Sequence, residues 1–166
     1  MSNILFIEKK MRHEKQSLMY LSAILKEKGH RTELAQTDEE NIFSVIEKFN
    51  PDFFAYSICT GEHKYALETN SKLKQRYPDK ISIFGGPHST FFPEIINEKN
   101  VDYVVIGQGE DAIIDIINGN TKQKVIKKPL IENLNQLPIP DREVVYKYDE
   151  FKNNPMKNII TQRDCP

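Results

Sequence analysis

The residues best suited to bind a ligand follow an apolar run at positions 81–84; they are Gly85, Gly86, Pro87, His88, Ser89 and Thr90. An apolar run without alternation is typical of a strand buried on both faces of a parallel sheet. Two adjacent glycines at its carboxyl end remove both Cβ atoms, so a flat or bulky ligand could approach the backbone closely. The same pair also suits a simple tight turn, and the pattern alone leaves both interpretations open.

Two further loops carry the same kinds of residue after predicted strands. They contribute hydroxyl groups, glycines and one carboxylate: Ser57, Thr60, Gly61, Gly107, Gly109 and Glu110. Carboxyl ends of parallel strands meet at one edge of the sheet, and this is where open α/β sheets bind ligands. Backbone groups and single hydroxyls suit a large neutral ligand. No nucleophile, base and orienting group occur together, so the pattern fits acid–base catalysis poorly.

Common nucleotide and metal motifs do not fit this chain. The pair Gly107 and Gly109 lacks the third glycine of a dinucleotide fingerprint, and no phosphate loop of the form G-x-x-x-x-G-K-[ST] occurs. The four histidines are not spaced as metal ligands. We expect His63 to be solvated in the first turn of a helix and Cys59 to be a small buried residue. His88 fits either a structural hydrogen bond or a ligand contact.

Hydrophobic patterns predict five strands that alternate with five helices. We expect strands near residues 3–7, 31–36, 52–56, 80–84 and 102–106. We expect helices near residues 14–28, 38–49 (capped by Asp38), 62–77 and 91–98, and a fifth that stops at 118–119. This alternation requires right-handed βαβ crossovers. It predicts an α/β fold with a flavodoxin-like, doubly wound, five-stranded parallel sheet in the order 2-1-3-4-5.

The character of the chain changes after Gly119. Lysines and three prolines make residues 119–141 too irregular for a sheet strand, so we interpret them as an arm that crosses the surface or links to another domain. Residues 143–151 could form a short helix, and residues 158–161 have the pattern of one more strand. We therefore predict two parts, residues 1–119 and residues 120–166, of which the second leads into a further domain of a longer protein.

The charge balance argues against some classes of partner. Lys and Arg number 23 and Asp and Glu number 24, a net charge of −1, which disfavours binding to nucleic acid or membrane surfaces by bulk electrostatics. No apolar run reaches the roughly 20 residues needed to span a bilayer, and no signal-peptide pattern follows Met1. Two cysteines do not make a disulfide framework. We predict a soluble cytoplasmic protein.

Several runs of the sequence together resemble a known family. They read Ser57-x-x-Thr60-Gly61-x-His63-x-x-Ala66-Leu67, then Phe84-Gly85-Gly86-Pro87-His88-x-Thr90-Phe91-x-Pro93-Glu94, then Val101-Asp102-Tyr103-Val104-x-Ile106-Gly107-x-Gly109-Glu110. They look like the cobalamin-binding domain of cobalamin-dependent radical S-adenosylmethionine enzymes. Residues 129–142 resemble the connector that these enzymes carry between domains. Residues 159–166 are similar to the first barrel strand and the start of their C-x-x-x-C-x-x-C iron–sulfur motif.

The resemblance implies that cobalamin lies on the carboxyl rim of the sheet, with its nucleotide tail beside Ser57 and the glycine pair. It implies cofactor-binding roles for residues of that rim, namely Ser57, Thr60, Gly61, Gly85, Gly86, Pro87, His88, Thr90, Gly107, Gly109 and Glu110. Cys165 would be the first ligand of a [4Fe–4S] cluster. The cluster and S-adenosylmethionine belong only to the full-length protein, whose C-terminal radical barrel would be a partner of this domain.

One segment departs from related cobalamin proteins. Mutases and methionine synthase carry a D-x-H-x-x-G loop after the first strand, and its histidine ligates cobalt. Residues 8–14 here lack that motif, so we do not expect a histidine on the lower cobalt face. Whether Met11 or Arg12 lies over that face stays open.

Two functions follow from the sequence. The first is a cobalamin-binding module of an enzyme that transfers a methyl group or performs a related radical step, which the fragment alone could not catalyse. The alternative is a Rossmann-like scaffold or interaction domain that has lost cobalamin binding. A flavin-binding domain ranks below both, because the loop after the first strand lacks the small residues of a phosphate nest.

Overall fold

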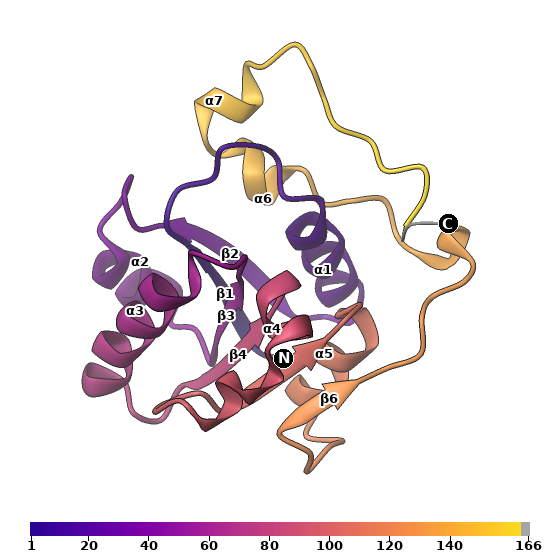
Figure 1. Cartoon of the computed structure of the whole chain (residues 1–166). Coiled ribbons are helices and arrows are strands. Elements are labelled where there is room, and N and C mark those ends of the chain that lie inside the picture. The colour runs from indigo at the N-terminus through magenta and orange to yellow at the C-terminus, as the bar shows by residue number, and fades with distance from the viewer. Residues whose placement is uncertain (164–166) are drawn as a thin grey trace.

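Six parallel strands form one sheet in the computed structural model, which describes residues 1–163 (Figure 1). They are β1 (Asn3–Glu8), β2 (Arg31–Gln36), β3 (Phe53–Ser57), β4 (Ile81–Gly85), β5 (Tyr103–Ile106) and β6 (Val125–Lys127). Their order is β2-β1-β3-β4-β5-β6, and every neighbouring pair is parallel. The α/β class and the flavodoxin-like order of the first five strands are confirmed. The predicted number of strands, five, is wrong, because β6 extends the sheet.

Helices cover both faces of the sheet. They are α1 (Gln16–Glu27), α2 (Ile42–Phe49), α3 (His63–Arg76), α4 (Pro87–Phe91), α5 (Glu110–Ile117), α6 (Glu143–Tyr146) and α7 (Asp149–Lys152), with 3₁₀ turns η1 (Pro93–Asn97) and η2 (Leu134–Gln136). α1 and α5 pack on one face, and α2 and α3 pack on the other (Figure 1). This is the doubly wound arrangement that the sequence predicts.

Alternation along each strand divides the core into two layers. The layer under α1 and α5 contains Phe6, Ala55, Ile83 and Val105. The layer under α2 and α3 contains Leu5, Phe54, Phe84 and Val104. The register pairs Ser57 of β3 with Gly85 of β4, so these two strands end at the same level. The loops that follow them therefore lie side by side.

The sixth strand lies inside the arm that we expected to be irregular. Ile126 is buried and pairs with Val105, and the amide of Val104 donates to the Lys124 carbonyl at 2.8 Å. Three residues with one buried side chain are too short a pattern to distinguish a strand from a loop in the sequence. The edge of β5 supplies the hydrogen-bond partners that make the strand form.

The expected strand at residues 158–161 does not form. Side chains take both backbone groups of Asn158: its amide donates to Glu14 at 3.0 Å, and its carbonyl accepts from Gln16 and Arg142, each at 2.8 Å. Three other boundaries also differ from expectation. Residues 143–151 form two short helices, α6 and α7. The helix expected at 91–98 is instead the 3₁₀ turn η1, which α4 precedes, and Asn41 rather than Asp38 caps α2.

The arm is docked against the domain through α1. The Asp141 carboxylate accepts a hydrogen bond from Ser22 at 2.5 Å and pairs with Lys26 at 2.6 Å, and its amide donates to the Met19 carbonyl. Three apolar side chains of α6 and α7 enter the core layer under α1: Val144, Val145 and Phe151. The segment after Gly119 thus packs as part of the same body over much of its length.

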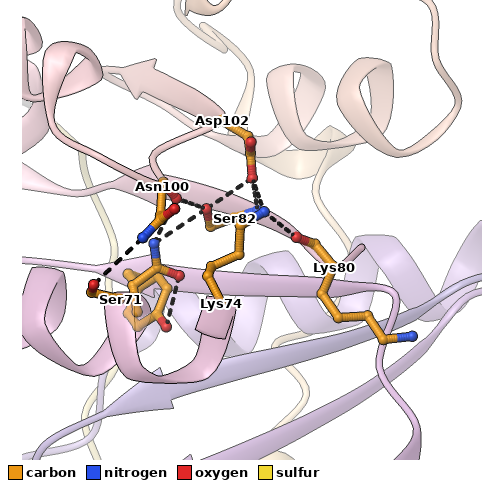
Figure 2. A network of polar contacts seen from close by, with 8 residues as sticks. Ser71, Lys74, Lys80, Ser82, Asn100 and Asp102 are labelled. Carbon is orange, nitrogen blue, oxygen red and sulfur yellow. Dashed lines mark hydrogen bonds and ion pairs between the residues drawn. The ribbon is translucent and has the colours of Figure 1, made fainter. Parts of the chain in front are cut away.

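A polar network stabilises the opposite, amino end of β4 and β5 (Figure 2). The buried Ser82 hydroxyl donates to the Asn100 carbonyl at 2.5 Å, and the Ser82 amide donates to the Asp102 carboxylate at 2.8 Å. Lys74 of α3 pairs with the same carboxylate at 2.9 Å. The buried Ser82 hydroxyl and amide both have hydrogen-bond partners within this network, as buried polar groups in a stable core usually do. This network holds α3, β4 and β5 together, far from the loops at the carboxyl rim.

Candidate functional site

A cavity of about 620 Å³ opens at the carboxyl rim, between the sheet and helices α1 and α5. Its floor is the apolar face of four strands: Phe6, Ala55, Ile83 and Val105. Its helical wall comes from Leu18 and Leu21 of α1 and Ile113 of α5. A volume of this size is typical of small-molecule and cofactor sites, and the apolar lining suits a flat organic group.

Most of the residues predicted from the sequence meet at this cavity. Those that line it are Ser57, Gly85, Gly86, Pro87, Thr90, Gly107, Gly109 and Glu110. Thr60, Gly61 and His88 do not line it: Thr60 and Gly61 lie in the loop before α3, and His88 lies in α4. The structure therefore brings the two glycine-containing loops together, and places the Thr60 loop beside them.

The two adjacent glycines have different roles. Gly85 continues the cavity-facing side of β4, and a Cβ built on it would touch Val105 and the Tyr56 carbonyl only at 3.9 Å, an ordinary contact. Gly86 has φ +91° and ψ −175°, and a Cβ there would lie 2.8 Å from the Ile58 nitrogen. Gly86 is therefore required by the close approach of the β3 loop. Gly85 is the position whose missing side chain leaves space in the cavity.

Thr90 connects the loops after β4 and β5. Its hydroxyl donates to the Gly86 carbonyl and accepts from the Gly107 amide, both at 3.0 Å. The β3 loop is held in the same way, since the Ile58 amide donates to the Gly85 carbonyl at 2.9 Å. Three strand ends are thus fixed relative to one another by hydrogen bonds. The rim is preorganised, which lowers the entropy cost of binding a ligand.

His88 makes a structural contact, the first of its two expected roles. Its Nδ1 lies 3.1 Å from the Thr60 hydroxyl, and its ring stacks between His63, with centroids 4.1 Å apart, and Phe92, at 5.0 Å. Burial lowers the pKa of His88, and the neighbouring His63 lowers it further. His63 is half-buried by this stacking rather than solvated as expected. Cys59, expected to be buried, is exposed.

The sequence profile of the B12 binding domain family matches residues 3–117, which include all five predicted strands, the glycine loops and α5. The chain belongs to this family. The matched segment supplies the sheet floor and the helical wall of the cavity.

Curated relatives of this B12-binding domain are longer proteins. At 26% identity it is similar to an uncharacterized methyltransferase of Pyrococcus horikoshii, over 90% of this chain and 38% of the relative. At 25% identity it is similar to the anaerobic magnesium-protoporphyrin IX monomethyl ester cyclase of Rubrivivax gelatinosus, over 76% of this chain and 24% of the relative. The chain thus spans well under half the length of these relatives.

A solved structure has the same fold. The crystal structure of the N-terminal domain of a hypothetical protein of Thermotoga maritima matches with a TM-score of 0.52 and 27% sequence identity. The match covers 72% of this chain and 98% of that domain.

The carboxyl end of β1 in this B12-binding domain places the Glu8 carboxylate at the rim, and the loop that follows carries no D-x-H-x-x-G motif. Lys15 lies 2.5 Å from Glu8 and donates to the Ser57 carbonyl at 3.1 Å. Burial raises the pKa of Glu8 to about 7, although Lys15 favours the charged form. Met11 is buried in the core and its amide donates to Gln36, so it does not project over the rim, whereas Arg12 and His13 are exposed.

Sequence reasoning missed part of the cavity lining. The periodicity of α1 could have assigned Leu18 and Leu21 to an inner face, but not to a ligand site. Four residues after Gly119 also line the cavity, but the sequence assigned them to a connector and to the start of a further domain rather than to the site: Leu130, Ile160, Gln162 and Arg163. They reach the cavity only through the tertiary path of the chain.

Two further observations concern metal ligands and membrane spans. Within residues 1–163, no group of three or more His, Cys, Asp or Glu side chains could hold a metal ion. In the same part of the chain, no helix is long and apolar enough to cross a bilayer. Cys165, the expected first cluster ligand, lies outside the described residues.

Proposed function

We propose that this domain is the cobalamin-binding module of a longer enzyme, and that the cavity takes the nucleotide tail of the cofactor. The observation that carries the proposal is the open space above Gly85, between an apolar sheet face and α1 and α5. A planar base would pack against Leu21 and Val105, and the ribose would lie beside the loops that carry Ser57 and Thr90. The residues present therefore fit the group.

The corrin ring would rest on the rim itself. Phe91 lines the mouth of the cavity and is 77% exposed, a large apolar surface that a bound ring would cover. The edge after β1 offers Glu8 and Lys15 and lacks the D-x-H-x-x-G motif, so a protein imidazole is not expected on the lower cobalt face. When bound, cobalamin supplies a cobalt centre that can carry a methyl group or take part in radical chemistry.

The finer proposal concerns the parent enzyme. Because the chain resembles cobalamin-dependent radical S-adenosylmethionine enzymes, we infer that a radical barrel follows, with Cys165 as one ligand of a [4Fe–4S] cluster. The names of the relatives, a methyltransferase and a cyclase, are compatible with this class. The substrate would be selected by that barrel.

One observation favours the alternative, a scaffold that no longer binds cobalamin. Gly86 is explained by packing against Ile58 alone, so the glycine pair does not by itself require a ligand. The two functions differ in what they require at position 85. Cobalamin binding needs a small residue there, whereas a scaffold does not.

The test uses that difference. Hydroxocobalamin is added to the purified chain, excess is removed by desalting, and the absorption spectrum of the eluate is recorded. The wild type and Gly85→Ala should retain a stoichiometric corrinoid, because a methyl group at this position makes only ordinary contacts. The leucine side chain of Gly85→Leu should fill the cavity, so this variant should remain folded but lose the corrinoid. A colourless wild-type eluate would leave the scaffold as the function.

A further inference from the structure

Part of the cavity wall lies outside the family segment. The B12 binding domain match ends at residue 117, yet Leu130, Ile160, Gln162 and Arg163 also line the cavity. Leu130 belongs to the segment after β6, and the other three residues follow α7. Without residues 158–163, here named the closing segment, the cavity would be open on this side.

The closing segment is held at both ends. At its start, both backbone groups of Asn158 are bonded to side chains of Glu14, Gln16 and Arg142, as described above. At its end, the Arg163 guanidinium pairs with Glu110 at 2.5 Å and lies over the Tyr20 ring at 4.9 Å.

The ion pair at the end of the closing segment is well shielded from solvent. The side chain of Arg163 is 15% exposed and that of Glu110 is 6% exposed. Shielded pairs lose hydration, so they stabilise a structure only where geometry and partners compensate. Here the compensation comes from the first turn of α5 and the Tyr20 ring, both of which belong to the cavity wall.

We propose that the closing segment is part of the cofactor site: it covers the nucleotide loop of a complete corrinoid, and the Arg163–Glu110 pair holds it closed. This inference rests on the proposed function and adds a preference for corrinoids that carry the nucleotide loop. The segment faces a cavity whose floor is the mid-strand residues Ala55 and Ile83, below the rim. The proposed function places the corrin ring on the rim, so the part of the cofactor that would reach this depth is the nucleotide loop. The closing segment should therefore distinguish corrinoids with the loop from those without it.

The experiment compares two probes on the whole chain. Dissociation constants are measured by absorption titration for hydroxocobalamin and for dicyanocobinamide, which has the corrin ring but no nucleotide loop. Arg163→Ala removes a charged hydrogen bond, and we expect about tenfold weaker cobalamin binding with cobinamide binding changed by less than about twofold. Arg163→Lys keeps the charge beside Glu110 and should restore most of the affinity.

The matched control is Arg76→Ala, which breaks an Arg–Glu pair of 2.6 Å with both side chains more than half exposed, on α3 and α2. It should leave both constants unchanged. Equal losses for both probes in Arg163→Ala, or a loss no larger than in Arg76→Ala, would overturn the assignment of the closing segment. A wild type that binds neither probe would overturn the proposed function itself, and this inference with it.

Discussion

Two neighbouring glycines with opposite roles give a sharp test of how the rim is built. Replacing Gly86 by alanine forces a side chain into a backbone region that is essentially reserved for glycine, with φ +91° and ψ −175°. Such strain costs about 1–3 kcal/mol. The new Cβ would also lie 2.8 Å from the nitrogen and 2.9 Å from the carbonyl oxygen of Ile58. Backbone atoms cannot move aside as a flexible side chain can, and overpacking adds about 1–3 kcal/mol.

We therefore expect Gly86→Ala to lower the free energy of unfolding by about 2–6 kcal/mol, a large part of the stability of a domain this size. Gly85→Ala is the matched variant. Its Cβ meets nothing closer than 3.9 Å, and alanine restricts the unfolded chain, so its stability should be unchanged or higher by about 0.4–1 kcal/mol.

Urea unfolding followed by far-UV circular dichroism measures both values, and equal slopes with urea would show that the same transition is compared. The reasoning is refuted if the two variants lie within about 1 kcal/mol of each other, which is near the error of such extrapolations. It is also refuted if Gly85→Ala is the more destabilised, since the contacts at the two positions would then be assigned the wrong way round.

Two more predictions concern groups that hold the domain together. Asp141→Ala leaves the fully buried Ser22 hydroxyl without this acceptor and Lys26 without its partner. We therefore expect the free energy of unfolding to fall by about 1–3 kcal/mol in the same urea assay. The control Glu150→Ala, at an exposed position, should leave it unchanged. Burial raises the pKa of Glu8 from 4.5 to about 7, so the folded state holds its proton more tightly than the unfolded state does. The stabilisation from this carboxyl should be complete below pH 4.5 and lost as pH rises towards 7, and Glu8→Gln should remove that decline. A wild type and a Glu8→Gln variant with parallel stability–pH curves between these values would contradict the assignment.

The rim could be predicted because its signals are local. An apolar strand followed by Gly85 and Gly86 predicts a buried strand and a ligand-accessible loop, whatever the rest of the chain does. The sequence could not tell which glycine makes room for a ligand and which avoids a clash. That distinction depends on Ile58, in a loop that reaches Gly86 only when β3 and β4 pair.

The arm was the least predictable part because its structure is set by distant partners. Asp141 contacts Ser22 across 119 positions of sequence, and no pattern within residues 120–166 signals this contact. β6 forms because β5 presents an open edge, and residues 158–161 remain outside the sheet because the backbone of Asn158 is bound by side chains. In each case a tertiary contact overrode a local tendency.

The docking of α6 and α7 decides where this domain can be cut or exchanged. A chimera that grafts residues 3–117 onto another enzyme would leave behind Val145 and Phe151, which complete the core layer beneath α1. In the recipient, the hydrophobic face of α1 would be exposed and the sheet would lack its sixth strand. The unit that should be transplanted, or expressed alone, extends at least through α7.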